Sequence, residues 1–305
     1  MTWGHKKADF FKKTAVVASV STALVLCVIK TIASLMTGSI AVLSSLVDSL
    51  ADVVASVISM IAVKFSLKPA SCMYRYGYFK AEAISALIQA AFIAGSGLFV
   101  MYNGIERLIN PLPLKQTNIG ILVMVVSLVL SIGLILFQGF VLKNTQSLAI
   151  KADSAHYTVD ILTNLATLLS LYIVQKFRIQ IVDVVTAFFI SIYLFYYAFD
   201  IAREAIDCLM DKELDVAIRQ NIVYLVKHTK GIKGLHDVRT RNFGGAYSFE
   251  LHLEMDGNLT LNEAHRLSDL VEKKIKKVYP NAQVLIHQDP FGIKEERLDD
   301  SLKDC

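Results

Sequence analysis

The chain contains six apolar stretches that are each long enough to cross a lipid bilayer, and this feature restricts its fold more than any other. A helix needs roughly 20 predominantly apolar residues to span the hydrocarbon core. Because lipid offers no hydrogen-bond partners to backbone groups, and because the stretches do not alternate strictly, each is predicted to form a transmembrane helix. The stretches lie near residues 14–36, 39–64, 81–106, 117–141, 150–175 and 179–202.

The composition agrees with a membrane protein. Of the 305 residues, 54% are hydrophobic and 19% are charged, which is more apolar and less charged than an average soluble domain. Lysines precede the first apolar stretch, as they do in a secretory signal peptide. However, the stretch continues past residue 30, beyond the roughly 7–15 apolar residues of a signal peptide. We therefore expect the first span to be retained.

Basic residues between the stretches are unevenly distributed, and this predicts the orientation, because the side richer in lysine and arginine is usually cytoplasmic. The richer side carries Lys6, Lys7, Lys12, Lys13, Lys68, Arg75, Lys80, Lys143 and Lys151. The poorer side carries Arg107, Lys115, Lys176 and Arg178. With an even number of spans, both termini are expected to be cytoplasmic.

The composition changes after about residue 205, where charged residues become dense and no further stretch could span a membrane. Residues 1–208 are predicted to form a six-helix transmembrane domain, and residues 209–292 a small cytoplasmic α+β domain. The charged tail, 293–305, is expected to be disordered. Hydrophobic periodicity predicts helices at 213–228 and 260–279 and strands at 234–242, 247–255 and 284–286.

Ionisable residues occur in matched pairs inside two of the predicted spans. Asp48 and Asp52 lie four apart in the second span, and His156 and Asp160 lie four apart in the fifth, so each pair shares one helical face. An aspartate at the centre of a span costs on the order of 3 kcal/mol. A divalent cation would neutralise the carboxylates, and three carboxylates with one imidazole suit Zn²⁺ or Fe²⁺. The alternative is that these groups only hydrogen-bond helices together.

His156 also suggests how metal movement is coupled to protons. An imidazole must be neutral to bind metal, so that metal binding displaces protons, and histidine titrates near physiological pH. Metal/proton exchange at this site is a hypothesis from the sequence. Asp153, one turn nearer the cytoplasmic end of the same span, is expected at the membrane interface.

Histidine and aspartate also gather in the predicted cytoplasmic domain, at His236, His252, His265, His287 and Asp289. His287 and Asp289 are two residues apart in an extended segment, so both point to the same side. Such a cluster is typical of a binuclear zinc site in which Asp289 bridges the ions. The alternative is a set of solvated surface histidines, because histidine is commonly half-exposed.

Several other classes of function lack support in the sequence. Cys27, Cys72, Cys208 and Cys305 form no CxxC pair, which argues against a disulfide framework or a thiolate zinc site. No basic tract with interleaved aromatic residues points to nucleic acid. No nucleophile–base motif, Walker loop or phosphorylated-aspartate motif is present, so neither an enzyme nor an ATP-driven pump is expected.

Over nearly its whole length the chain resembles the cation diffusion facilitator family, in particular the bacterial ferrous-iron and zinc efflux transporters. The motifs that carry the resemblance are LVDSLAD at 46–52, KADSAHYTVD at 151–160, GLHDVRTR at 234–241, LHLEM at 251–255 and IHQDP at 286–290. The resemblance implies six spans in the inner membrane, a metallochaperone-like cytoplasmic domain, a homodimer and metal/proton antiport.

The resemblance also implies roles for individual residues. Asp48, Asp52, His156 and Asp160 match the family's transport site. All five cytoplasmic His and Asp positions match residues that bind metal at the dimer interface. Such a site would let the protein sense cytoplasmic metal. Lys80 and Asp211 match a charge pair that interlocks the dimer near the membrane surface.

One loop departs from the family pattern. Close relatives carry an acid and two histidines between the second and third spans, where this chain has Ser71, Tyr74 and Tyr78. These side chains are poor metal ligands, and this accessory site is expected to be absent.

The sequence therefore predicts a dimeric exporter of a divalent cation, with Zn²⁺, Fe²⁺, Cd²⁺ or Mn²⁺ as the transported and regulatory ion. Nitrogen and oxygen ligands accept all four ions, so the ligand set does not choose among them. The competing reading is a membrane-anchored metal sensor or scaffold that binds metal without moving it. The cytoplasmic histidines fit both readings, whereas the intramembrane pairs favour transport.

Overall fold

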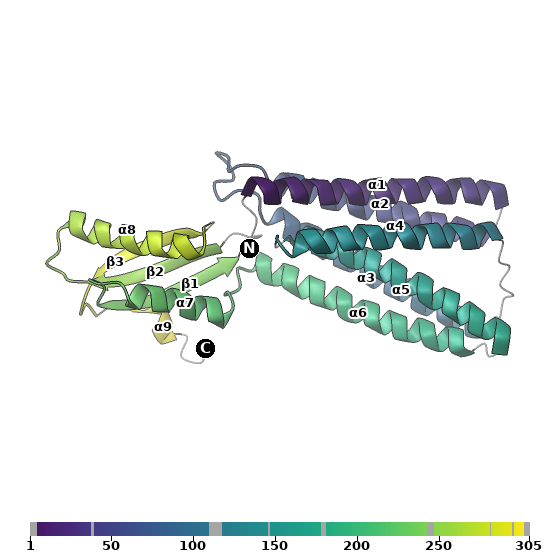
Figure 1. The fold of residues 1–305 in the computed structure, drawn as a ribbon. Helices are drawn as coiled ribbons and strands as arrows, with labels where there is room; N and C mark the ends of the chain where they lie inside the picture. The colour runs from purple at the N-terminus through teal and green to yellow at the C-terminus, as the bar shows by residue number, and fades with distance from the viewer. Residues whose placement is uncertain are drawn as a thin grey trace. The chain divides into compact units, whose positions relative to one another are not determined.

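The computed structural model describes residues 5–37, 40–109, 118–145, 147–177, 181–242, 247–280, 282–294 and 296–301. The chain divides into two compact units, Met1–Ile206 and Asp207–Cys305. The first is helical, and the second combines a sheet with helices (Figure 1).

Long helices build the first unit, as the apolar stretches predict. They are α1 (His5–Thr37), α2 (Ile40–Ser66), α3 (Ala81–Ile109), α4 (Asn118–Leu142), α5 (Leu148–Phe177) and α6 (Ile181–Leu209). Within the described residues, α1 to α4 and α6 are long and apolar enough to cross a membrane. The remaining helix, α5, carries Lys151, Asp153, His156 and Asp160 in its first half.

Two apolar cores hold these helices together, and α5 contributes to both. The first core joins α1, α2, α4 and α5, with Ala15, Val63 and Val141 fully buried. The second joins α3, α5 and α6 around Ile93, Ala155 and Leu194. Alanine is frequent in both cores, and small side chains let helix backbones approach closely. A helix shared by two cores is a rigid place for functional side chains.

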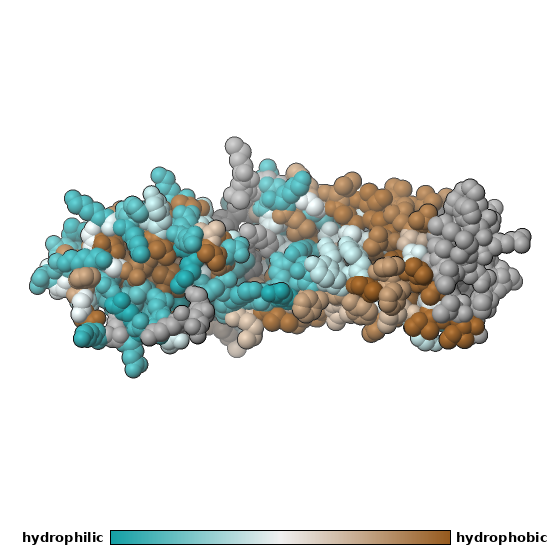
Figure 2. All heavy atoms as spheres, turned by 90° about the horizontal axis from the view of Figure 1, so that it is seen from below, coloured by the Kyte–Doolittle hydropathy of each residue, from teal (hydrophilic) through white to brown (hydrophobic). Residues whose placement is uncertain are grey.

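The outer surface of the helical unit is apolar. Figure 2 shows hydrophobic residues over this unit and mainly hydrophilic ones over the second unit. Leu35, Leu136 and Tyr196 are each at least 70% exposed. Soluble monomers rarely expose contiguous apolar surface on this scale, and lipid is the solvent that such a surface requires.

The second unit is an α+β domain with a three-stranded sheet. Its elements are α7 (Val216–Lys227), β1 (Gly234–Asn242), β2 (Tyr247–Met255), α8 (Leu261–Val278), β3 (Gln283–Pro290) and α9 (Leu298–Ser301). The strand order is β1-β2-β3, with β1 and β2 antiparallel and β2 and β3 parallel. Phe249 and Leu251 of β2 pack with Ile222 of α7 and Val271 of α8 in the core. One face of the sheet is therefore apolar, which leaves the other face for polar side chains.

A capping box begins helix α8. The backbone N–H of Thr260 donates to Oε2 of Glu263 at 2.8 Å, and the Thr260 hydroxyl donates to the same oxygen at 2.7 Å. The pKa of Glu263 lies below its usual value because the Thr260 backbone N–H, and then its hydroxyl, stabilise the carboxylate.

The tail differs from the sequence expectation of disorder. Residues 298–301 form α9, and two reciprocal hydrogen bonds join it to β1. The Asp237 amide donates to Oδ2 of Asp299 at 2.9 Å, and the Asp299 amide donates to Oδ1 of Asp237 at 3.0 Å. Arg297 adds a 2.6 Å hydrogen bond to Glu254. Such local pairs are invisible to composition, from which disorder was expected; residues 302–305 lie outside the described part of the chain.

Candidate metal sites

A cluster of three ionisable side chains lies between α2 and α5. Nε2 of His156 lies 2.8 Å from Oδ1 of Asp52 and 4.0 Å from Oδ2 of Asp160. One ligand atom from each residue lies within 4.8 Å of the others. Asp52 and His156 are buried, and Asp160 is half-buried. Two carboxylates and an imidazole at this spacing form a ready set of ligands for one divalent cation.

Asp48, the fourth residue predicted for this site, is placed differently. It lies one turn before Asp52 on α2, but its side chain is exposed and it is not in the group that surrounds His156. Helical spacing puts Asp48 and Asp52 on one face but does not fix how far each side chain reaches toward α5. The structure thus brings together three of the four predicted residues.

The ring of His156 has one nitrogen that faces the carboxylates and one that does not. Its Nδ1 is buried and has no hydrogen-bond partner among the described residues. In metal-ligating histidines, the ring nitrogen that does not bind the metal usually has an outer hydrogen-bond partner, which Nδ1 lacks among the described residues. Nε2 is the candidate ligand atom because both carboxylates face it.

Asp153, expected near the membrane interface, is buried among the helices of the first unit, and its depth in the membrane stays a prediction. Gln138 of α4 donates to its Oδ2 at 2.6 Å, and Ser56 of α2 donates to Oδ1 at 3.5 Å. The sequence signal was its place three residues before His156, one helical turn away on the same side. Its partners on two other helices were out of reach of sequence reasoning.

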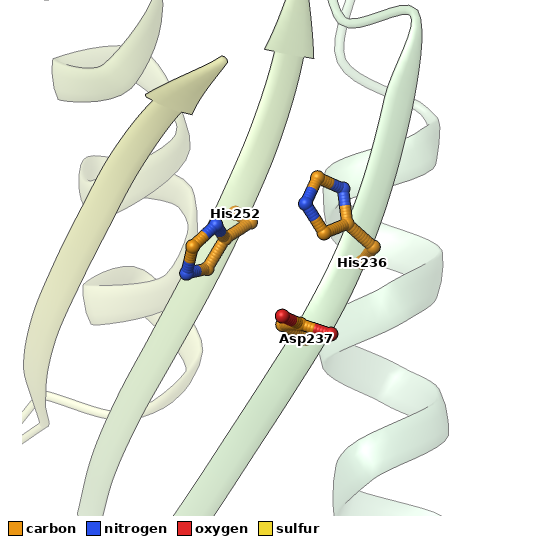
Figure 3. Close-up of side chains that lie close together, drawn as sticks. All are labelled: His236, Asp237 and His252. Carbon is orange, nitrogen blue, oxygen red and sulfur yellow. The ribbon is translucent and has the colours of Figure 1, made fainter. Parts of the chain in front are cut away.

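A row of histidines crosses the sheet of the second unit. His236 of β1 lies opposite His252 of β2, and His252 lies opposite His287 of β3. The ring centroids are 5.0 Å apart in the first pair and 4.7 Å in the second. The row occupies the polar face of the sheet, which follows from the inward alternation of Phe249 and Leu251. Figure 3 shows His236 and His252 on neighbouring strands.

Asp289 lies at the centre of this row. Its Oδ2 is 3.0 Å from Nδ1 of His252 and 3.6 Å from Nε2 of His236, and its Oδ1 is 3.1 Å from Nε2 of His287. Asp289 and His236 are buried, whereas His287 is exposed. One carboxylate facing three imidazoles can bridge two cations, as the sequence hypothesis supposes.

Two acidic residues that sequence reasoning missed also belong to this cluster. Asp237 groups with His236 and His252 (Figure 3), and Glu254 lies 3.1 Å from Nδ1 of His236. The pairing register of β1 and β2 shifts between His236 and Arg239, and Asp237 has a φ of 48°. This bulge changes the strict alternation that would otherwise put adjacent residues on opposite faces. Burial acts to raise the pKa of Asp237, but hydrogen bonds from the backbone of Asp299 and Leu298 hold it below its usual value.

His265, predicted as a further ligand, lies outside this cluster in the described residues. It is on α8, its side chain is 69% exposed, and its Nε2 lies 3.8 Å from Asp269 one turn later. Within a single chain, its position does not complete the histidine row.

The loop between α2 and α3 is closed by its own side chains. The hydroxyls of Ser71 and Tyr78 are 3.0 Å apart, the Tyr74 amide donates to the Ser71 hydroxyl at 3.2 Å, and the Tyr74 and Tyr78 rings lie 4.8 Å apart.

The two residues predicted to interlock the dimer, Lys80 and Asp211, belong to different units. Asp211 contacts Arg241 at 3.2 Å within the second unit, and Lys80 belongs to the first unit.

Comparisons with known proteins cover both units. Residues 16–210 match the cation efflux transmembrane domain, and residues 214–291 match the cytoplasmic domain of cation efflux proteins. The cation-efflux pump FieF of Shewanella oneidensis is 42% identical over 94% of this chain and 96% of its own length. The FieF pump of Klebsiella pneumoniae is 39% identical over 92% of this chain and 93% of its own. A solved structure, the metal-bound C-terminal domain of the CzcD transporter from Thermotoga maritima, is 27% identical over 26% of this chain and 94% of its own, with a TM-score of 0.25.

Proposed function

Because the chain belongs to the cation efflux, or cation diffusion facilitator, family, we propose that it exports a divalent metal cation across the inner membrane in exchange for protons. The observation that carries this proposal is the cluster of Asp52, His156 and Asp160 between two membrane helices. A scaffold that only binds metal has no need for ionisable groups at membrane depth, where they are costly. The FieF pumps to which the chain is similar support efflux as the direction of transport.

Three residues act as the core ligands in this proposal. His156 contributes Nε2, Asp52 contributes Oδ1, and Asp160 contributes a carboxylate oxygen from one turn along α5. Asp48 is assigned as a fourth ligand that joins when α2 turns or shifts relative to α5. A ligand that engages in one conformation only would help the two states of a transporter differ in affinity, which transport requires.

Proton exchange follows from competition at the same atoms. A proton on His156 Nε2 and a metal ion on that nitrogen exclude each other. In this proposal, metal arriving from the cytoplasm displaces the proton, and protonation from the other side releases the metal. The residues set no preference among Zn²⁺, Fe²⁺, Cd²⁺ and Mn²⁺, since all accept nitrogen and oxygen ligands.

The histidine row is assigned to a resident metal centre in the cytoplasmic domain. Its donors fit Zn²⁺, which takes imidazole nitrogen and carboxylate oxygen readily. His236, His252, His287 and Asp289 would hold the ions, which bring charge that neutralises the acidic residues around them. We assign the domain to homodimer formation, with His265 contributing from its exposed helix face. We further assign residues 1–208 to the transport domain and residues 209–292 to the cytoplasmic domain, with both termini in the cytoplasm.

The experiment is ion uptake into proteoliposomes under a pH gradient. The purified chain should carry Zn²⁺ into the vesicles in exchange for protons that flow out down the imposed pH gradient. A panel of Fe²⁺, Cd²⁺ and Mn²⁺ would identify the preferred cation. Asp52→Asn should abolish transport, and Glu204→Gln, a change at a half-exposed ion pair with Lys151, should preserve it. If the wild-type chain bound metal but moved none, the sensor or scaffold reading would replace the transporter.

A further inference from the structure

Glu82 is a buried carboxylate that joins four parts of the helical unit. It is the second residue of α3 and has no exposed surface. Its Oε1 lies 3.1 Å from Nζ of Lys12 on α1 and accepts a 2.7 Å hydrogen bond from Ser66 at the end of α2. Its Oε2 accepts a 2.5 Å bond from Ser147, immediately before α5. These contacts all lie at the linker end, which we define as the end where α6 reaches Leu209 and the chain continues into the second unit.

The ion pair can open only at a high cost. Lys12 is also buried, with 9% of its surface exposed. Separating a buried pair leaves an uncompensated charge, whereas water entering the gap would solvate both ions. The pair is therefore stable in a closed, dry arrangement or in an open, hydrated one, and is unstable in between. Such bistability is what a gate needs.

A polar stripe leads from this ion pair to the metal cluster. Asp52, Ser59 and Ser66 recur every seven residues on α2, and they share one face of the helix with Ser56. All four are buried at 9% exposure or less. These side chains form a buried polar line along α2 between Glu82 and His156, because Ser66 bonds to Glu82 at one end and Asp52 contacts His156 at the other.

Gln89 of α3 points into the middle of the stripe. Its Nε2 donates to the Ser59 hydroxyl at 3.0 Å. Its Oε1 is buried without a hydrogen-bond partner among the described residues, and the side chain has no exposed surface. An unpartnered amide oxygen inside a bundle is costly unless another group or water reaches it in some state. It is a suitable acceptor for water or for a hydrated cation in transit.

We propose that the α2 stripe is the route by which ions reach the metal cluster from the linker end, and that Glu82 is the latch that closes it. The latch holds α3 against α1, α2 and the start of α5. Its release lets α3 move away from the stripe, with Gln89 forming one wall of the open route. The proposal rests on the proposed transport function and assigns the gate of that same site. Glu82 is a positioning residue, since it acts through the helices it joins.

The test is the accessibility of the stripe to a thiol reagent. The four native cysteines are replaced, and Ser59→Cys provides a reporter midway between the latch and the cluster. A membrane-impermeant maleimide is added to vesicles that present the linker end to the outside. Both Glu82→Gln and Lys12→Gln should raise the labelling rate about tenfold, because each releases one half of the pair. The matched control is Glu204→Gln, which disrupts an ion pair at the same end but outside the stripe.

The exchange of charges provides a second, independent arm. The double variant K12E/E82K should label more slowly than either K12E or E82K, since it restores an ion pair. Zn²⁺ binding to the membrane cluster, measured in each variant, reports whether the bundle is folded; if Glu82→Gln fails to bind, Lys12→Gln decides. Unchanged labelling in the folded variants would overturn the latch even if the protein transports. Faster labelling in a chain that moves no metal would support the latch and remove the transport proposal.

Discussion

Asp52 of α2 and His156 of α5 meet through a 2.8 Å contact between Oδ1 and Nε2. This contact joins two helices at the site where we propose that a cation replaces a proton. Asp48 lies on the same helical face as Asp52 but outside this contact. The cluster therefore contains three of the four residues that the sequence pattern predicts.

The first prediction uses that separation. Asp52→Asn should weaken Zn²⁺ binding at the membrane cluster more than about a hundredfold, since losing a ligand exceeds the 10- to 100-fold cost of changing an outer partner. Asp48→Asn should weaken it less, because Asp48 is exposed and outside the cluster. Calorimetric titration of both variants with the cytoplasmic site inactivated by Asp289→Asn measures the two affinities. Equal losses would show that Asp48 is a full ligand in the metal-bound state.

The second prediction concerns the centre of the histidine row. Asp289→Asn should remove bound metal from the cytoplasmic unit, because Asp289 contacts all three histidines of the row. Equilibrium dialysis of the full chain carrying Asp52→Asn would count the ions that remain. Asp256→Asn, an exposed carboxylate that directly follows β2 and pairs with Lys233, is the matched control and should retain them. Retention of metal in Asp289→Asn would assign the ions to another set of ligands.

The third prediction concerns the tail. Arg297→Gln removes a hydrogen bond to Glu254, which also faces His236, and charged hydrogen bonds contribute about 1.5–3 kcal/mol. The amides of Asp237 and Asp299, which bond to each other's carboxylates, should then exchange hydrogen faster. Exchange followed by mass spectrometry gives the measurement, with Lys233→Gln as the control for loss of an exposed ion pair. Unchanged exchange would mean that the Asp237–Asp299 pair holds α9 without Arg297.

The fourth prediction is a pH dependence in the cytoplasmic unit. The pKa of Glu263 is lowered in the folded state by the Thr260 backbone N–H, so the carboxylate stabilises the fold when it is ionised. That stability is present above the unfolded pKa and is lost as the pH falls through the folded pKa. Thermal melts should show Glu263→Gln less stable than the wild-type chain at neutral pH. The difference should vanish in acid; a difference that persisted there would point to a role other than charge.

Much of the fold could be predicted from the sequence, because the periodicity of hydrophobic residues and the lengths of the apolar stretches can be read directly from the residue order. The strand of residues 247–255 coincides with β2, since Phe249, Leu251 and Leu253 alternate without interruption. The apolar stretches gave the long helices for the same reason. Helix ends were less certain, because α1 and α6 continue into polar residues beyond the apolar run.

The sites were only partly predictable, for a physical reason that differs between them. Spacing along one helix identifies a shared face, so Asp52, His156 and Asp160 could be selected together. Asp237 was missed because strict alternation turns it away from His236, and a bulge cannot be read from residue types alone. Glu82 was missed because its partners come from α1, α2 and the segment before α5, far apart in sequence.

The histidine row has a consequence for folding. His287 and Asp289 reach the row only because β3 pairs with β2 in one alignment. A slip of β3 by a single residue would turn both side chains toward Phe249 and the apolar core. A metal ion bound by the row would therefore stabilise only the correctly aligned sheet. Metal binding would in this way favour the native pairing of β3 with β2 when the domain folds.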